Sequence, residues 1–253
     1  MQQQSNTYII LFSVGLTVIV GGLLSFAAVG LKPAQEIQIQ LDTKKQILGA
    51  VMDLKPEDDV LAIYADRITS EVVDINGNPV ETNRKGDSIQ ADKVEIAKEY
   101  KLPPEERYYP VYKYMSKENP EEVEAYIFPV YGNGLWDKIW GYVALDANFE
   151  TIKGVSFDHK AETPGLGARI ASDEVQQRFI GKKIYDDQGN LVSVEMVKGE
   201  GQGSLDAHHV DGLAGATMTS KGVNNMLRSY LGSYQNYIQK VKGESKNLTL
   251  LHD

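Results

Sequence analysis

The residues best suited to chemistry lie in segment 211–220, which reads Asp-Gly-Leu-Ala-Gly-Ala-Thr-Met-Thr-Ser. Small residues there lead directly into the predicted last helix, and Thr217 places a hydroxyl group beside its first turn. Helix N-termini bind phosphate, because their free N–H groups and the macrodipole both favour an anion. A phosphate attached to Thr217 would therefore lie in a favourable field. Taken alone, the segment also fits a glycine-containing turn with Thr219 or Ser220 as the helix cap.

A second segment, residues 162–167, reads Glu-Thr-Pro-Gly-Leu-Gly and predicts a rigid turn. Pro164 fixes one backbone angle, and the two glycines expose backbone N–H groups that a planar heteroaromatic ring could meet. Leu166 would offer the same ring an apolar surface. The segment therefore favours a site for a flat, polar-edged ligand.

Both segments resemble parts of a known family. The first is similar to the acceptor motif of flavin transferases, Asp-x-x-(Ser/Thr)-Gly-Ala-Thr, whose final threonine receives FMN as a phosphoester. The second resembles the FMN-binding domain shared by the C subunits of sodium-translocating NADH:quinone reductases and the G subunits of Rnf complexes. Ala214 stands where the acceptor motif usually has Ser or Thr. The matching positions of the acceptor motif are Asp211, Gly215, Ala216 and Thr217.

The resemblance implies FMN bound covalently through its phosphate to Thr217, with Thr219 as the less favoured acceptor. It implies no catalytic residue and no metal ligand in this chain. The segment 134–136, Gly-Leu-Trp, resembles a further family segment near the flavin, although a hairpin turn with Trp136 packed in the core is the alternative. The other expected flavin contacts are Asp211, Gly215, Ala216, Met218, Glu162, Thr163, Leu166, Gly167 and Trp136.

The implied role is electron transfer within a sodium-translocating NADH:ubiquinone reductase, not NADH oxidation by this chain alone. Electrons would come from an iron–sulfur centre in the membrane subunits and pass to the FMN of the B subunit. The expected partners are the A, B, D, E and F subunits of the complex, together with a flavin transferase during maturation. The length of the chain favours the sodium pump over the Rnf complex. The alternatives are the Rnf-type G subunit and a membrane-anchored adaptor domain without flavin.

Two other groups of polar residues give weaker indications of a functional site. His208 and His209 are adjacent, and adjacent side chains of an extended segment point to opposite faces, so they do not readily share a metal ion. Ser220, His208 and Asp211 could be drawn as a hydrolase triad, but no nucleophile elbow surrounds the serine. His159 precedes the 162–167 turn and is interpreted as a surface side chain.

Composition narrows the class of protein. The chain has 253 residues and a net charge of −9, which argues against a nucleic-acid partner because phosphate backbones need a basic surface. It contains no cysteine, which excludes disulfides, thiolate nucleophiles and cysteine-ligated zinc or iron–sulfur clusters.

The N-terminal segment predicts a membrane anchor. No charged side chain occurs within 1–31, and the run from Tyr8 to Leu31 is almost continuously apolar. As a helix at 1.5 Å per residue, that run would be about 36 Å long, enough to cross the hydrocarbon core. A cleaved signal peptide normally has a basic start, which this chain lacks. We expect a single-pass anchor in the bacterial inner membrane, with the periplasmic placement of the remaining chain implied only by the resemblance.

The elements that must position these segments follow from the hydrophobic pattern. Apolar residues at helical spacing predict a helix over 34–52, another beginning at Pro56, and a long last helix from Ser220 with one wide apolar face. The pattern predicts a short helix from Ser172 to Phe179. The strands are predicted at 68–75, 125–131, 140–145 and 152–157, with a hairpin between 183–185 and 192–197.

The charged stretch 85–124, rich in Tyr and Pro, is expected to be irregular or to form an inserted lobe. The predicted fold is α+β: one transmembrane helix followed by an extracytoplasmic FMN-binding domain with an antiparallel sheet and flanking helices. The expected divisions are an anchor at 1–31, membrane-proximal helices with the inserted lobe at 32–130, and the FMN-binding domain at 131–253.

Overall fold

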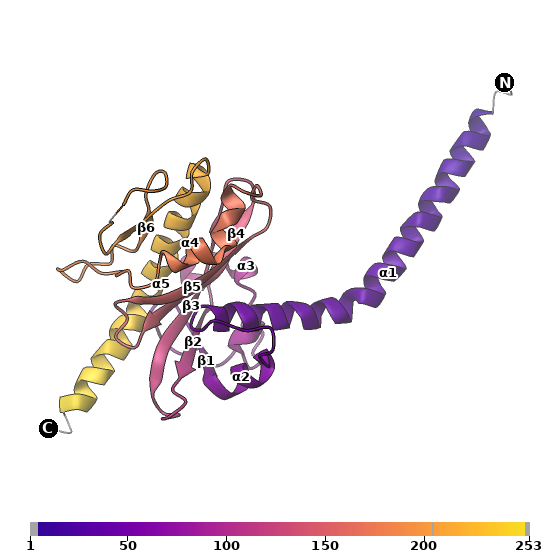
Figure 1. Ribbon diagram of the computed structural model, residues 1–253. Coiled ribbons are helices and arrows are strands. Elements are labelled where there is room, and N and C mark those ends of the chain that lie inside the picture. The colour runs from indigo at the N-terminus through magenta and orange to yellow at the C-terminus, as the bar shows by residue number, and fades with distance from the viewer. Residues whose placement is uncertain (1–4, 204, 251–253) are drawn as a thin grey trace. The chain divides into compact units, whose positions relative to one another are not determined.

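The computed structural model describes residues 5–203 and 205–250, and side chains up to residue 244 (Figure 1). Contacts divide the chain into two units, one ending at Thr43 and one beginning at Lys44. The first unit consists of helix α1 (Asn6–Gly49) up to that division. This helix is long and apolar enough to cross a membrane, and none of its most apolar window is buried. Within the described residues it is the one helix with those properties, as the sequence predicts.

Helix α1 is continuous where the sequence predicts two separate segments. Pro33 lies inside it, and the predicted helix over 34–52 is its second half. Proline removes one intrahelical hydrogen bond without necessarily ending a helix. The last turn of α1 belongs to the second unit, and there Ile47 and Leu48 are fully buried.

The centre of the second unit is an antiparallel sheet in the order β1-β2-β3-β4-β5 (Figure 1). Every strand pairs with its neighbour along the chain, so the sheet is a meander. All four strands of the sheet that the sequence predicts are confirmed, as β1, β3, β4 and β5. The strand bounds are β1 (Ile68–Val73), β2 (Tyr109–Met115), β3 (Val123–Asn133), β4 (Lys138–Asp146) and β5 (Ile152–His159).

The expectation for 85–124 was wrong in one important respect. The stretch contains β2, which lies between β1 and β3 and is buried over its first four residues. A strand covered on both faces has no apolar–polar alternation, so its pattern is hidden. The rest of the stretch consists of short helices: η1 (Ala91–Lys93), α3 (Ile96–Glu99) and η2 (Pro104–Glu106). The predicted division at 130/131 lies within β3, and the three-part division of the chain stays a prediction.

The smaller elements differ from the prediction mainly at their ends. Helix α2 (Val60–Arg67) begins after the acidic run, with Asp59 accepting a bond from Ala62 N. The short helix predicted from Ser172 is α4 (Asp173–Gln177), preceded by η3 (Gly167–Ala171). The hairpin predicted between 183–185 and 192–197 is reduced to one bridge, Tyr185 to Leu191. Instead, β6 (Glu195–Met196) pairs in parallel with β7 (His209–Val210).

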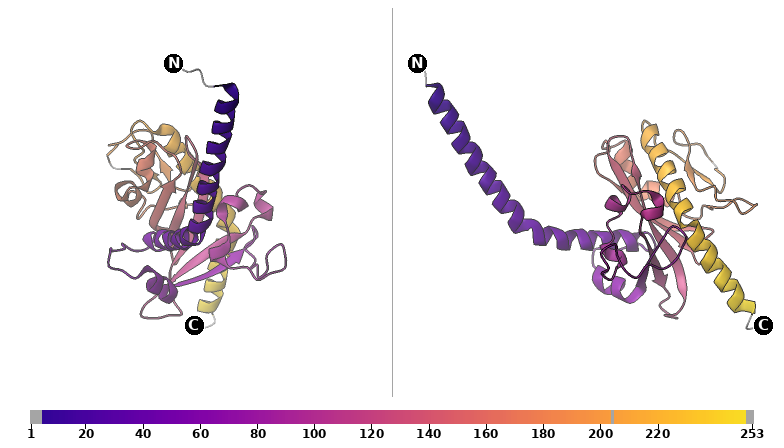
Figure 2. Two further views of the ribbon diagram at one scale, coloured as in Figure 1. Left: turned by 90° about the vertical axis from the view of Figure 1, so that its right-hand side faces the viewer. Right: turned by 180° about the vertical axis from the view of Figure 1, so that it is seen from behind.

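Helix α5 (Thr217–Leu250) packs along one face of the sheet (Figure 2). Its predicted apolar stripe is confirmed, because every stripe residue from Val223 to Ile238 is buried in the main core. Tyr234 is an example: its ring lies 4.6 Å from that of Phe128 on β3, and its hydroxyl donates to Pro110 O at 2.8 Å. The helix begins three residues earlier than predicted, at Thr217 itself. The chain is therefore an α+β protein in which a long helix delivers the 217–220 segment to one end of the sheet.

Two glycines of α5 allow a matched test of how the helix sits on the sheet. A Cβ on Gly222 would overlap Asn133 O at the end of β3, whereas a Cβ on Gly232 meets nothing within 4 Å. Glycine to alanine in a helix interior gains about 1 kcal/mol, and overpacking costs about 1–3 kcal/mol. We therefore expect Gly232→Ala to raise the free energy of unfolding and Gly222→Ala to lower it, measured by denaturant titration. Equal gains in both variants would contradict the close approach.

Candidate functional site

A buried carboxylate joins the segments that the sequence singles out. Glu162 is 4% exposed and follows β5. Its Oε1 accepts a hydrogen bond from Trp136 N at 3.0 Å, and its Oε2 accepts one from the Thr219 hydroxyl at 2.6 Å. The β3–β4 turn, the 162–167 turn and the first turn of α5 are thereby held together. Gly134 and Gly167 are required beside this carboxylate, because a Cβ on either would overlap its oxygens.

The 162–167 segment forms the predicted tight turn. Leu166 N and Ala168 N both donate to Thr163 O, at 3.1 and 3.2 Å, and Gly165 has a φ of +74°. The left-handed angle explains the glycine, since a side chain there is strained. The Thr163 hydroxyl also accepts the indole N–H of Trp136 at 3.1 Å. Backbone hydrogen bonds within the turn and the side-chain bond from Trp136 therefore both stabilise its conformation.

Four large apolar side chains are exposed on the three segments that Glu162 joins. Trp136 is 68% exposed and Met218 is 55% exposed. The interpretation of Trp136 as a core residue was therefore wrong. We call this group the exposed apolar face; it comprises Leu135, Trp136, Leu166 and Met218. Leu166 also lies against the acceptor segment, because a Cβ on Gly215 would be 3.0 Å from its Cδ2. Grouped exposed apolar side chains are typical of a ligand or partner site.

The hydroxyl groups of the first turn of α5 differ in their surroundings. Thr219 is 1% exposed and donates to Glu162, while Ser220 is 4% exposed, accepts from Leu213 N and donates to Ala216 O, both at 3.3 Å. Neither caps the helix, which begins before them. Thr217 is half-buried at the first helical position. The first helical hydrogen bond runs from Ser220 N to Ala216 O, so the N–H groups of 217–219 precede it.

The approach to Thr217 is held by an ionic clamp that the sequence did not reveal. Glu200 accepts bonds from Arg169 at 2.7 and 2.9 Å, from Arg178 at 2.7 Å and from Ala214 N at 3.3 Å. Arg178 also donates to the carbonyls of Asp211 and Gly212, at 3.2 and 2.9 Å. The clamp links residues far apart in sequence, so no local spacing indicates it. It ties η3 and α4 to the loop that ends at Thr217.

Asp211 also contributes to the conformation of this loop. Its carboxylate accepts bonds from Gly201 N at 3.1 Å and Gln202 N at 3.0 Å. The carboxylate thus links Asp211 back to Gly201 and Gln202. Gly212 is required next to it, because a Cβ there would overlap Val197 O. The contact of Asp211 with a cofactor stays a prediction, and its visible role is to shape the acceptor segment.

The clamp predicts a specific acid sensitivity. Hydrogen bonds from Arg169 and Arg178 lower the pKa of Glu200 from 4.5 to about 2. A carboxyl whose pKa is lower in the folded state contributes stability above its unfolded pKa, and that contribution is lost as pH falls toward the folded value. We expect the free energy of unfolding to fall between about pH 4.5 and 2, with a smaller fall in Glu200→Gln. Identical pH profiles for both proteins, followed by circular dichroism, would contradict this role.

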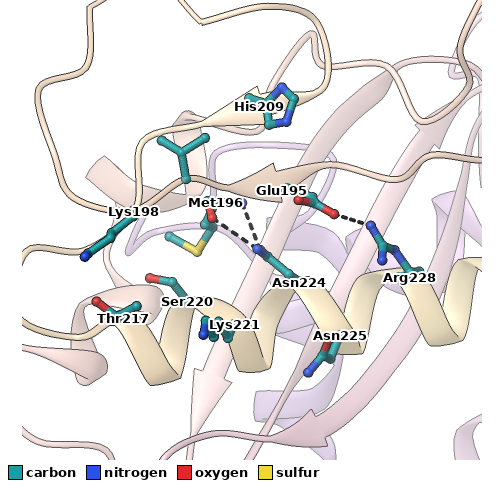
Figure 3. A pocket seen from close by; sticks show the side chains of 11 residues that line it. Glu195, Met196, Lys198, His209, Thr217, Ser220, Lys221, Asn224, Asn225 and Arg228 are labelled. Atoms are coloured by element: carbon teal, nitrogen blue, oxygen red, sulfur yellow. Dashed lines mark hydrogen bonds and ion pairs between the residues drawn. The ribbon is translucent and has the colours of Figure 1, made fainter.

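A groove of about 550 Å³ runs beside Thr217 (Figure 3). Its floor is formed by α5 and by β6, which Asn224 holds through bonds to Met196 N at 2.8 Å and Met196 O at 3.1 Å. Glu195 and Arg228 within it form an ion pair. The lining residues are Glu195, Met196, Val197, Lys198, His209, Thr217, Ser220, Lys221, Asn224, Asn225 and Arg228.

The histidines that the sequence raised do not converge. His208 Nδ1 lies 2.8 Å from Lys183 O, and His209 Nδ1 lies 2.7 Å from Asp206 Oδ1. His159 Nδ1 accepts a bond from Glu162 N at 3.3 Å and so supports the turn. Among residues 5–203 and 205–250 no group of three or more His, Asp or Glu side chains could hold a metal ion.

The comparisons with known proteins agree with this arrangement. The model of the FMN-binding domain family matches residues 134–232, which include both turns and the start of α5. The C subunit of the Na⁺-translocating NADH-quinone reductase from Neisseria meningitidis serogroup A is 35% identical over 252 residues, covering 94% of each chain. The corresponding protein from Pseudomonas aeruginosa is 34% identical, covering 91% of this chain and 93% of its own.

Solved structures of C subunits of the reductase are also similar to this chain. The crystal structure of the reductase's C subunit from Parabacteroides distasonis superimposes with a TM-score of 0.70 at 33% identity, covering 82% of this chain and 96% of that one. NqrC from Shewanella oneidensis, at a TM-score of 0.67 and 24% identity, supports the fold alone. The fold, the FMN-binding domain and the full-length similarity together place this chain in one family: it belongs to the C subunits of the Na⁺-translocating NADH-quinone reductases.

Proposed function

We propose that Thr217 carries FMN as a phosphoester and that the chain relays electrons within the reductase complex. The observation that carries the proposal is the exposed apolar face beside a hydroxyl at the start of α5. A flat heteroaromatic ring fits that face, because covering Trp136, Leu166 and Met218 removes apolar surface from water. The phosphate fits the N-terminus of α5, whose dipole favours an anion.

The choice of Thr217 over Thr219 has a direct physical reason. The Thr219 hydroxyl is buried and already donates to Glu162, so a phosphate there would break that bond and displace the carboxylate. Thr217 is half-buried and lines an open groove. Attachment forms an O–P bond from Thr217 to the flavin phosphate of a phosphoanhydride donor bound by the flavin transferase. The P–O–P bond of the donor breaks, its second phosphate departs as the leaving group, and the proton of the Thr217 hydroxyl passes to the transferase.

In the assembled site the protein's residues bind and orient while the flavin supplies electron-transfer chemistry. The 162–167 turn offers backbone N–H groups and the side chain of Leu166 to the ring. The indole of Trp136 is held next to this turn by its hydrogen bond to Thr163. Glu162 uses both oxygens within the protein, so its part is to fix the spacing between the ring face and the acceptor helix. Thr163, Gly167, Gly215 and Ala216 are proposed to line the same site.

The proposed surroundings follow from the family. Helix α1 fits a single-pass anchor in a membrane-bound complex. We place the complex in the bacterial inner membrane with the flavin domain on the periplasmic side, where a covalent bond prevents loss of a cofactor that no surrounding pool could replace. The A, B, D, E and F subunits are the proposed partners, with electrons passing from an iron–sulfur centre through this flavin to the FMN of the B subunit.

The proposal is tested by maturation of the full chain with a flavin transferase. Intact-mass analysis should show an increase equal to FMN less one water, and denaturing electrophoresis should show a fluorescent band. A polypeptide with only its amino-acid mass, from a host that flavinylates a known acceptor in parallel, contradicts the proposal and favours a membrane-anchored adaptor.

A further inference from the structure

The groove beside Thr217 carries positive charge that plays no part in the proposed contacts with the flavin ring. Five ionisable residues line it: Glu195, Lys198, His209, Lys221 and Arg228. Glu195 and Arg228 pair with each other, and His209 bonds Asp206. Within the part of the chain that the structure describes, neither Lys198 nor Lys221 forms an ion pair. The groove therefore keeps two uncompensated ammonium groups.

This surplus contrasts with the rest of the neighbourhood. Arg169 and Arg178 each form ion pairs with both Glu174 and Glu200. The chain as a whole carries a net charge of −9. Lys198 comes from the segment after β6, and Lys221 comes from the second turn of α5. Figure 3 shows both at the end of the groove where Thr217 lies.

We propose that Lys198 and Lys221 form an anion subsite that holds the phosphodiester at Thr217. The inference rests on the proposed attachment of FMN, and it adds the residues that neutralise the phosphate. Lys198 lines the groove from the segment after β6 and Lys221 lines it from the helix, while the N–H groups of 217–219 lie at the start of that helix. Mobile lysine side chains suit a phosphate that must first be delivered and then retained, because an ammonium binds it as a point charge without a fixed geometry.

Two consequences distinguish this role from general solubility. Flavin transfer should be slower when either ammonium is removed, by about two- to fivefold for each lysine at low ionic strength, the range for an exposed charge pair. The difference should disappear near 1 M salt, where the screening length falls to about 3 Å. The phosphorus nucleus of the attached flavin should also sense each lysine directly.

The experiment uses the full chain in a detergent without phosphate. Lys198→Gln, Lys221→Gln and the double variant are flavinylated with a transferase, and the rate is followed by in-gel fluorescence and intact mass. The matched control is Lys240→Gln, about 28 Å further along α5. Phosphorus NMR of the completed proteins then compares the phosphodiester resonance. We expect slower transfer and a displaced resonance in the groove variants only, with Lys→Arg restoring both.

Three other results would overturn the subsite, and the first would overturn the proposed function as well. If the wild-type chain acquires no flavin mass, the proposed function and the subsite both fail. If flavin is attached but rates and resonances match the wild type, the subsite alone fails. If transfer slows while the phosphorus resonance stays in place, the lysines contact the transferase and not the phosphate, which also overturns the subsite.

Discussion

Replacing Thr217 by alanine is expected to abolish covalent flavin completely. The change removes one hydroxyl from a half-buried position at the start of α5, and alanine is well accepted in a helix. The fold should therefore persist, with a thermal midpoint unchanged within about 2 °C, since no hydrogen bond joins this hydroxyl to another of the described residues. In-gel fluorescence and intact mass measure the loss. Thr217→Ser keeps a hydroxyl at the same place and should keep flavin attachment.

The matched control is Thr219→Val, which removes the competing hydroxyl and keeps the side-chain shape. Its cost is local: Glu162 Oε2 loses a donor, about 1–3 kcal/mol for a buried group. Flavin should still be attached, because Thr217 is untouched. The assignment would be wrong if flavin persisted in Thr217→Ala and disappeared in Thr219→Val, and peptide mapping of the fluorescent fragment would show the change of site directly.

The elements that the sequence predicts well are those with a simple environment. Helix α5 has one face on the sheet and one in water, so its stripe at three- and four-residue steps is clear. Strand β2 has buried residues in succession and lies within a charged, tyrosine-rich stretch, so nothing in its pattern separates it from a loop. The two-residue pairing of β6 with β7 is also too short to leave a pattern.

The residues of the candidate site also fall into a part that the sequence predicts and a part that it does not. The acceptor segment and the 162–167 turn could be read from contiguous residues, because local chemistry and family resemblance act at that scale. Glu162 and its two partners, Trp136 and Thr219, come from three places in the sequence, and only folding brings them together. The clamp of Glu200 with Arg169 and Arg178 is equally non-local. Exposure of Trp136 could not be predicted either, since tryptophan is usually buried.

The second large effect is expected at Glu162. In Glu162→Ala, the buried hydroxyl of Thr219 and the backbone N–H of Trp136 lose their acceptors. Leaving a buried polar group unpaired costs about 1–3 kcal/mol, and hydrogen bonds to a charged acceptor are at the upper end. For a unit of this size, each kcal/mol lowers the thermal midpoint by about 2–4 °C. The midpoint of Glu162→Ala should therefore fall by several degrees, measured by circular dichroism of the full chain.

Glu162→Gln separates hydrogen bonding from charge. The amide oxygen can still accept from Trp136 N, and the amide N–H can donate to Thr219 Oγ1, whose own hydrogen can turn to the carbonyl one helical turn back. Both groups keep a partner, so this variant should lose about 1 kcal/mol or less. Gly134 and Gly167, which leave room for a planar carboxyl group, accommodate the amide equally.

The same pair of variants reports on function, because Glu162 fixes the distance between the exposed apolar face and the start of α5. In the alanine variant the indole of Trp136 keeps its bond to Thr163, but the backbone of Trp136 is no longer linked through Glu162 to Thr219 on α5. Flavin can still be attached at Thr217, but the ring should lie less firmly against the protein, which raises its fluorescence in the folded state. The glutamine variant should match the wild type. If glutamine proved as damaging as alanine, the negative charge of Glu162 and not its hydrogen bonds would be what the site requires.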